Sequence, residues 1–445
     1  MKMLLLRPYY GITVHSDMHG DLGIADCYTH VFPDISLVLS ATVASKCSSV
    51  ELDVIDANAE KLLPKDVLLR LNESYDLIVI KAAAVSVKYD IEFARALKAR
   101  YPHSKLIFGG HAAKVLHNWL RKNVAEIDDI SCEPLEYYIY KLLNNTSSVC
   151  LNDLPAPDYS LLPYKDFKDF DGLVRASLYM SRGCTTGCTY CPHFAFYGNK
   201  IDSRSVEKVI EDIKGLLKLG ISNIEFKDQF FTINRDTTAE LCEQIIENKL
   251  NIKWRCQTRL ETLDRKLIDL MVKSGLEILF FGVESASEET LKSFNRPSNN
   301  KENMKDLINY LNEKGVTTIA FYIIGFPEDT WESINDTFEL SVELKSISAN
   351  YFIYNPYVFN DSSFSSLKIA PDLFGVFENN LLVDASKNLS MEELKFLEFQ
   401  LPILYKIKTA GLETAYNYEY CHKQRYKNEL SEKIKKLKEC SIFEI

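Results

Sequence analysis

Three cysteines stand close together near the middle of the chain. Cys184, Cys188 and Cys191 follow a C-x-x-x-C-x-x-C spacing in a loop that also contains Gly183 and Gly187. Thiolates are soft ligands that suit zinc and iron–sulfur clusters. A structural zinc site and a four-cysteine iron–sulfur site each take four protein ligands. Three ligands in one tight loop therefore favour a cluster with one iron left open for a small molecule.

Two other interpretations of these cysteines stay open at this point. The three residues are either reduced thiols without a cofactor, or zinc ligands completed by His193 two positions after the third cysteine. The rest of the chain bears on the choice, because a cluster that activates a small molecule needs a scaffold and further binding groups around it.

The cysteine spacing resembles the motif of the radical S-adenosylmethionine (SAM) enzymes. In that family three cysteines hold a [4Fe-4S] cluster, SAM binds the fourth iron, and an electron from the cluster cleaves SAM to a 5′-deoxyadenosyl radical. The residue before the third cysteine is typically aromatic and contacts the adenine, and here it is Tyr190. The resemblance thus implies Cys184, Cys188 and Cys191 as metal ligands and Tyr190 as a SAM contact.

Composition limits the class of protein. The chain has 445 residues, of which 46% are hydrophobic and 26% charged, as expected of a soluble globular protein with two or three domains. A net charge of −10 argues against nucleic acid or an anionic membrane as a partner. Apolar runs are too short for a membrane span or a signal peptide. We expect a cytoplasmic location, where a reducing environment suits a cluster.

Strands and helices alternate in the first part of the chain. Four strands are expected, at 2–7, 50–56, 76–80 and 105–110, with helices between them, including 34–46 and 89–100. This order predicts a Rossmann-like, doubly wound parallel sheet. Ligands of such sheets bind at the carboxyl ends of the strands, where Gly109 and Gly110 lie.

The same order resembles the cobalamin-binding domain that precedes the barrel in one large branch of radical SAM proteins. Gly109 and Gly110, followed by residues 130–136, match its usual spacing, which implies that the two glycines contact cobalamin. The cobalt-ligating D-x-H-x-x-G motif is not reproduced, because residues 17–23 contain His19 but are one residue too long. Many proteins of the branch lack that histidine, so the sequence leaves cobalamin binding open.

The remaining chain divides into a linker, a barrel and a helical end. Prolines in residues 146–172 predict an extended linker between residues 1–145 and the barrel. Six strand–helix units over 173–358 predict a partial (β/α)6 barrel, with its chemistry at the carboxyl ends of the strands. Helical spacing at 391–409 and 424–439 predicts a helical C-terminal region over 359–445.

Four residues at the predicted strand ends complete the SAM site that the resemblance implies. Asp228 lies where the family places an acidic group on the SAM ammonium, and Glu284 lies near the methionyl or ribose part. Gly325 belongs to a step that lines the adenine. Arg259 is a cation suited to the SAM carboxylate. The plain alternative for each is a solvated loop residue or, at Gly325, a turn.

The resemblance implies a radical SAM enzyme that removes hydrogen from a substrate carbon, for cobalamin-dependent methyl transfer in natural product biosynthesis. One alternative is epimerisation, dehydration or rearrangement without cobalamin, and another is a cobalamin- or cluster-based sensor. We expect a small-molecule substrate rather than a peptide, an external electron donor such as flavodoxin or ferredoxin, and no nucleic-acid or membrane partner. The sequence assigns no catalytic residue and no particular substrate.

Overall fold

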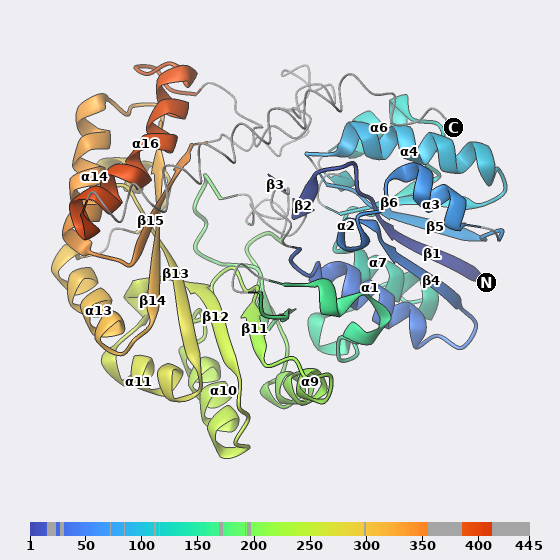
Figure 1. Ribbon diagram of the computed structural model, residues 1–445, viewed down its shortest axis with the longest axis horizontal. Helices are drawn as coiled ribbons and strands as arrows, with labels where there is room; N and C mark the ends of the chain where they lie inside the picture. Colours follow the sequence, from blue (N-terminus) through green and yellow to red (C-terminus); the bar gives the residue numbers. More distant parts are fainter. Residues whose placement is uncertain are drawn as a thin grey trace.

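The computed structural model describes residues 1–15, 24–26, 31–71, 73–83, 85–110, 113–114, 116–168, 172–191, 193, 197–297, 300–354 and 385–411. Two α/β units lie side by side, one coloured blue to cyan and the other green to red in Figure 1. Each is built on a parallel sheet. The prediction of an α/β fold with two such units is confirmed.

The N-terminal unit is a doubly wound sheet, as predicted. Its five parallel strands run in the order β4-β1-β5-β6-β7: β1 (Lys2–Arg7), β4 (Glu51–Asp56), β5 (Leu77–Lys81), β6 (Lys105–Gly109) and β7 (Asp129–Ile130). The chain order reverses at β1, which pairs with both β4 and β5. The short strand β7 and an antiparallel hairpin of β2 (Thr13–His15) and β3 (Ile24–Asp26) were not predicted.

Helices cover both faces of this sheet because its strands are apolar on both sides. Met3 and Leu5 pack on one face with helices α1 (Ile35–Ser45) and α7 (Leu135–Asn144). Leu4 and Leu6 pack on the other face with α3 (Pro64–Arg70), α4 (Val87–Arg100) and α6 (His117–Asn123). Such apolar runs are typical of parallel strands that are buried on both sides.

The second unit is a barrel that does not close. Six parallel strands pair in sequence order: β8 (Arg175–Leu178), β11 (Asn223–Phe226), β12 (Lys253–Thr258), β13 (Leu276–Glu284), β14 (Thr317–Ile324) and β15 (Ser348–Ile353). The outer helices are α9 (Val206–Lys218), α10 (Arg235–Glu247), α11 (Arg265–Lys273), α13 (Lys301–Glu313) and α14 (Trp331–Leu344). Among the described strands β8 and β15 are the edges, which confirms the partial barrel.

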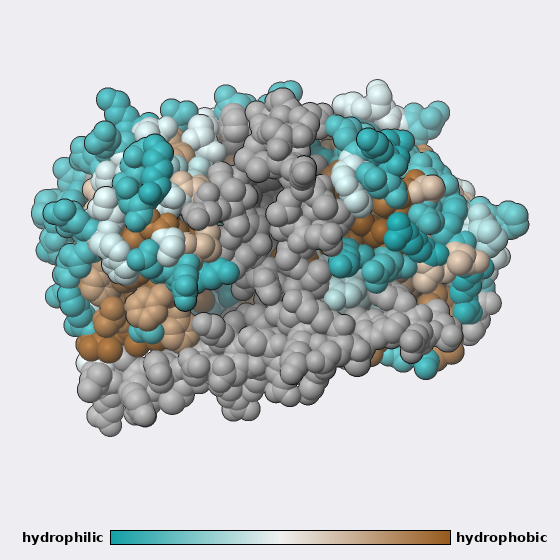
Figure 2. All heavy atoms as spheres, turned by 90° about the horizontal axis from the view of Figure 1, so that it is seen from above, coloured by the Kyte–Doolittle hydropathy of each residue, from teal (hydrophilic) through white to brown (hydrophobic). Residues whose placement is uncertain are grey.

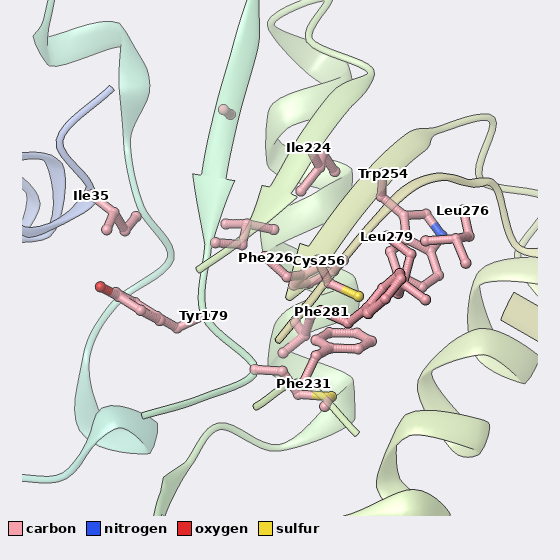
Figure 3. Close-up of a cluster of buried hydrophobic side chains, with 14 of the residues drawn as sticks. Ile35, Tyr179, Ile224, Phe226, Phe231, Trp254, Cys256, Leu276, Leu279 and Phe281 are labelled. Atoms are coloured by element: carbon pink, nitrogen blue, oxygen red, sulfur yellow. The ribbon is translucent and has the colours of Figure 1, made fainter. Parts of the chain in front are cut away.

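Burial alternates along the barrel strands, which separates a helix-covered side from a lumen side. In β14 every second residue from Thr318 to Ile324 is buried, while the residues between them are only partly buried. Phe226, Trp254 and Phe281 belong to the buried cluster shown in Figure 3. The same apolar cluster includes Ile35 of the N-terminal unit, so one continuous core joins the two units.

The segment between the units is more ordered than an extended linker. It contains three 3₁₀ helices, η1 (Leu151–Asp153), η2 (Tyr159–Leu161) and η3 (Tyr164–Asp166), so the prediction of a segment without elements was wrong. Tyr159 is buried, and its hydroxyl donates to the Ser177 carbonyl and accepts from the Ser177 amide, at 2.8 and 2.7 Å. Asp158 donates its amide to Thr42 of α1 at 2.9 Å. These bonds connect α1 to the first barrel strand.

Helix α16 (Met391–Ala410) covers the last barrel strand, β15, close to its predicted bounds. The predicted helix at 424–439 lies outside the described residues. On the face seen in Figure 2 the described residues are mostly hydrophilic, with smaller brown areas on the left and on the right. No helix in the described part of the chain is long and apolar enough to cross a membrane.

Gly325 allows α16 to pack closely, and we expect Gly325→Ala to loosen it. The residue has φ of +80°, and an added Cβ would lie 2.7 Å from Leu394 Cδ1. The positive φ costs about 1 kcal/mol and the crowding about as much again. Gly315 is a matched control, since its φ is also +80° and nothing lies within 4 Å of an added Cβ. Urea denaturation should show the larger loss for Gly325→Ala, and equal losses would contradict the packing role.

Candidate functional site

The cysteine loop leaves the barrel at the carboxyl end of β8. Two short antiparallel strands, β9 (Ser181–Arg182) and β10 (Asp202–Ser203), close the base of the loop. Gly183 has φ of +97°, and a Cβ there would lie 2.0 Å from the Lys200 carbonyl oxygen. Gly187 also has a positive φ, of +73°. Gly183 therefore lets the loop pass close to residue 200, and Gly187 provides the left-handed turn, with nothing within 4 Å of an added Cβ.

The three cysteine side chains differ in burial. Cys188 is buried, whereas Cys184 and Cys191 are partly exposed, and none of the three forms a disulfide. Burial raises the pKa of the Cys188 thiol, while the guanidinium groups of Arg296 and Arg259 act in the opposite direction. Within the described residues no three His, Cys, Asp or Glu side chains surround one point as ligands of a single ion. A [4Fe-4S] cluster requires no such point, because each thiolate bonds a different iron.

Asp228 holds the start of this loop in place. Its buried carboxylate accepts from the backbone amides of Met180 and Ser181 and from the Ser181 hydroxyl, at 3.0 Å for Met180 and 2.8 Å for the hydroxyl. Burial raises the pKa of Asp228 to about 7, against the effect of these donors. The next residue, Gln229, accepts from the Gly183 amide at 2.6 Å. Asp228 thus positions the chain that leads to Cys184, while its predicted contact with SAM stays a prediction.

Glu284 sits in an unusual backbone conformation at the end of β13. Its φ is +73°, which is uncommon for a residue other than glycine and costs of order 1–3 kcal/mol. Gly282 makes room for it, because a Cβ at Gly282 would lie 1.9 Å from Glu284 Oε1. Burial raises the pKa of Glu284, while the guanidinium of Arg296 and a hydrogen bond with Tyr190 lower it. The fold therefore directs the Glu284 carboxylate towards the cysteine loop.

Arg259 follows β12 and is already paired. Its Nη2 contacts the carboxylate of Glu261, and its guanidinium lies 5.7 Å from the ring centre of Phe230. Its Nε is buried and donates to no group among the described residues. The Nε–H group is thus a donor that a ligand could use, and binding of the SAM carboxylate by Arg259 stays a prediction.

Tyr190 joins an aromatic cluster that lies over the barrel mouth. Its ring centre lies 6.3 Å from that of Phe294 and 6.1 Å from that of Phe326. Tyr354, which follows β15, completes the cluster at 5.2 Å from Phe294 and 5.0 Å from Phe326. Gly325 precedes Phe326 directly, so the structure brings the two predicted adenine contacts to the same place.

Sequence reasoning missed several members of this site. Gln229 accepts a hydrogen bond from Gly183 of the cysteine loop, and the rings of Phe294 and Phe326 contact Tyr190. Arg296 contacts Glu284, which lies next to the loop. Arg296 is a single charged residue in a loop, and no sequence motif around it indicates a role in the site. Gln229 gave a weak signal, since it directly follows Asp228 at a strand end.

The two glycines predicted to contact cobalamin serve close packing in the N-terminal unit. A Cβ on Gly109 would lie 2.3 Å from Leu135 Cδ1 of α7, and Gly110 has φ of +102° with the Ala82 carbonyl oxygen 2.7 Å from an added Cβ. Nearby, Lys81 at the end of β5 pairs with Asp34 at 2.7 Å. His19 lies outside the described residues.

The carboxyl edges of the two sheets meet at a small cavity of about 20 Å³. Its walls include residues from both units: Lys81, Gly110, Glu136, Tyr179, Arg182 and Tyr197. This volume is room for about one water molecule. Residues 111–112 and 194–196, which are next to Gly110 and Tyr197 in sequence, lie outside the described part of the chain.

A buried ion pair crosses from the N-terminal unit to the cysteine loop. Arg182 donates to Glu136 of α7, and both side chains are almost fully buried. Glu136 also accepts from the Ser36 hydroxyl at 2.6 Å. The guanidinium lies 4.4 Å from the ring centre of Tyr179 and 5.2 Å from that of Tyr137. The position of Cys184, two residues later, is thereby tied to α7.

We expect Glu136→Ala to destabilise the protein by about 3 kcal/mol, because it leaves the Arg182 charge buried without its partner. Glu133→Ala is the matched control. Glu133 is two residues before α7, and its pair with Lys141 at 2.6 Å is partly exposed, so its loss should cost less than about 1 kcal/mol. Urea denaturation of both variants measures the free energy of unfolding. Similar decreases in the two variants would show that the Arg182–Glu136 pair stabilises the protein no more than the exposed pair does.

Comparison with known proteins points to one family. A protein-family model described as "Radical SAM superfamily" matches residues 178–341. An uncharacterized methyltransferase of Pyrococcus horikoshii is 30% identical over 208 residues, which are 46% of this chain and 45% of that protein. The anaerobic magnesium-protoporphyrin IX monomethyl ester cyclase of Rubrivivax gelatinosus is 26% identical over 250 residues, 55% of this chain and 44% of the cyclase. The chain spans about half the length of these relatives.

A solved structure shares the arrangement of both units. The radical SAM methyltransferase TsrM from Kitasatospora setae, with cobalamin and a [4Fe-4S] cluster bound, aligns with a TM-score of 0.66 at 14% identity. The alignment covers 80% of this chain and 76% of TsrM. At this identity the likeness establishes the fold. The family model matches the segment that contains all three cysteines, so residues 178–341 are similar to the radical SAM superfamily.

Proposed function

We propose that the chain is a radical SAM enzyme in which Cys184, Cys188 and Cys191 hold a [4Fe-4S] cluster. The observation that carries the proposal is the position of these three thiols. They lie in one glycine-containing loop at the carboxyl ends of the strands of a partial parallel barrel. The donor set fits the group, since three thiolates leave one iron open. A reduced cluster at this site supplies the electron that cleaves SAM to a 5′-deoxyadenosyl radical.

The residues around the loop have separate tasks in this proposal. Asp228 and Gln229 fix the chain that enters the loop. Tyr190, with the aromatic cluster and Gly325, offers an apolar surface for the adenine. Glu284 presents a carboxylate to the methionyl or ribose part of SAM, and Arg259 presents a guanidinium to the SAM carboxylate. These groups bind and orient SAM and exclude water, and the radical chemistry belongs to the cofactor.

We further propose cobalamin-dependent methyl transfer to a small molecule. Support comes from the fold shared with TsrM, whose structure contains cobalamin, and from the methyltransferase name of the Pyrococcus relative. In this proposal residues 1–145 form the cobalamin-binding domain with Gly109 and Gly110 at its ligand edge, 146–172 the connection, 173–358 the barrel, and 359–445 a C-terminal helical region. An external donor such as flavodoxin or ferredoxin supplies the electron.

A second radical reaction is favoured by one specific observation. The Rubrivivax relative is named a cyclase rather than a methyltransferase. Ring formation or another rearrangement would use the same cysteine loop and the same SAM contacts, so these residues alone do not separate the two reactions. The products separate them.

Product analysis tests both proposals in one experiment. The protein, produced with cobalamin in the medium and purified without oxygen, is incubated with SAM, a reductant and a small-molecule extract. A methyltransferase should form S-adenosylhomocysteine together with 5′-deoxyadenosine and should contain cobalt. 5′-Deoxyadenosine without S-adenosylhomocysteine or cobalt would contradict methyl transfer and support the second reaction. Absence of 5′-deoxyadenosine from a reduced, iron-loaded sample would contradict radical chemistry and favour a sensor.

A further inference from the structure

Residues 294–296 form a second wall of the cysteine loop. The Phe294 carbonyl accepts from the Thr189 amide at 3.0 Å, and the Asn295 carbonyl lies 3.8 Å from Cys188 Sγ. Asn295 has φ of +54°, the left-handed conformation that asparagine tolerates better than most residues. The segment follows the short helix α12 (Glu288–Ser293). It therefore contacts the loop at Thr189 and Cys188, whereas Asp228 holds the start of the loop at Met180 and Ser181.

Arg296 brings a buried positive charge to this wall. Its side chain is 4% exposed, and its Nη2 donates to the Gly282 carbonyl. Nη2 lies 3.9 Å from Glu284 Oε1, and Nη1 lies 4.0 Å from Glu261 Oε1. Arg296 thus links the strained end of β13 to the cysteine loop.

The charged side chains around Arg296 balance when it is present. Arg259 and Arg296 are positive, and Glu261 and Glu284 are negative, so the four side chains sum to zero. Buried charges are screened less than exposed ones, so the loss of one arginine would change the field at Cys188.

We propose that Arg296 is a positioning residue that also makes the cluster easier to reduce. The inference rests on the proposed function, because it requires a cluster on Cys184, Cys188 and Cys191. Reduction adds one electron from an external donor and hence one negative charge at the cluster, while no bond is made or broken. Arg296 directly follows Asn295, whose carbonyl lies 3.8 Å from Cys188 Sγ, and its buried guanidinium stabilises that added charge. Without Arg296 the remaining three charged side chains have a net negative charge, which makes reduction of the cluster less favourable.

Redox titration of the cluster, followed by its electron paramagnetic resonance (EPR) signal, tests the proposal without any substrate. Arg296→Gln and Arg296→Met remove the charge, and each should lower the equilibrium constant for reduction at least tenfold, a shift of 59 mV for one electron. Arg296→Lys keeps the charge and should stay near the wild-type potential. Arg265→Met is the control, because Arg265 is exposed on α11 and pairs with Asp306 at 2.6 Å.

The outcomes distinguish this inference from the function on which it rests. A wild-type protein that binds no cluster contradicts the proposed function and the inference together. A wild-type cluster with the same potential in Arg296→Gln, or an equal fall in Arg296→Lys and Arg296→Gln, contradicts the inference alone. If Arg296→Met does not assemble a cluster, the comparison of Arg296→Gln with Arg296→Lys still decides the question.

Discussion

Cys188→Ala is expected to bind no [4Fe-4S] cluster and to form no 5′-deoxyadenosine. Cys188 is the buried member of the three cysteines, and an open-iron cluster held by three thiolates has no spare ligand. Cys184→Ala and Cys191→Ala should behave in the same way. Iron content and visible absorption after reconstitution without oxygen measure the cluster, and chromatography measures the nucleoside.

Cys242→Ala is the matched control for these variants. Cys242 is a fully buried cysteine on α10, away from the loop, so its replacement should leave a small cavity and a complete cluster. A Cys188→Ala protein that kept its iron and its absorption band would contradict the assignment of the ligands. Loss of the cluster in Cys242→Ala would show that iron binding follows general stability instead.

Asp228→Asn is expected to lower the iron content several-fold and to destabilise the protein by about 2 kcal/mol. Both carboxylate oxygens of Asp228 accept, one from the Met180 amide and the other from the amide and hydroxyl of Ser181. An asparagine must turn its NH₂ group towards one of these donors, which leaves a buried N–H group without an acceptor. The start of the cysteine loop then loses its anchor.

Asp90→Asn provides a control with the same chemistry in the other unit. Asp90 is fully buried and accepts from the Tyr10 hydroxyl, the Ser86 hydroxyl and the Ala83 amide, and burial raises its pKa to about 7, as for Asp228. A hydroxyl can reverse and accept, so an asparagine NH₂ group can face Tyr10. We expect a smaller loss of stability and a normal iron content. Equal iron contents in the two variants would contradict the positioning role of Asp228.

Regular elements could be predicted because their signal is local. The strand Lys2–Arg7 was predicted to the residue, because its apolar run ends directly before Pro8. Strand β7 is only two residues long and gives no periodic pattern, so it was missed. The 3₁₀ helices between the units were missed because prolines indicate a break but not the turns that follow it.

Several residues of the candidate site could be predicted from the sequence, but the contacts between them could not. The cysteine spacing is a local pattern, and the glycines of the loop support it. That Asp228 bonds Met180 and Ser181, 48 and 47 residues earlier, depends on how β8 and β11 pair. Likewise, Gly325 meets Leu394 only after α16 has packed. The place of Arg296 in the site could not be predicted, because it depends on how the fold brings separate strand ends together.

The most direct test of the account is the formation of 5′-deoxyadenosine by the purified, reconstituted protein. With SAM and dithionite in the absence of oxygen, the wild-type protein should release 5′-deoxyadenosine in amounts that rise with time and iron content, and Cys188→Ala should release none. A protein that carries a full, reducible cluster and still leaves SAM intact would contradict the central claim.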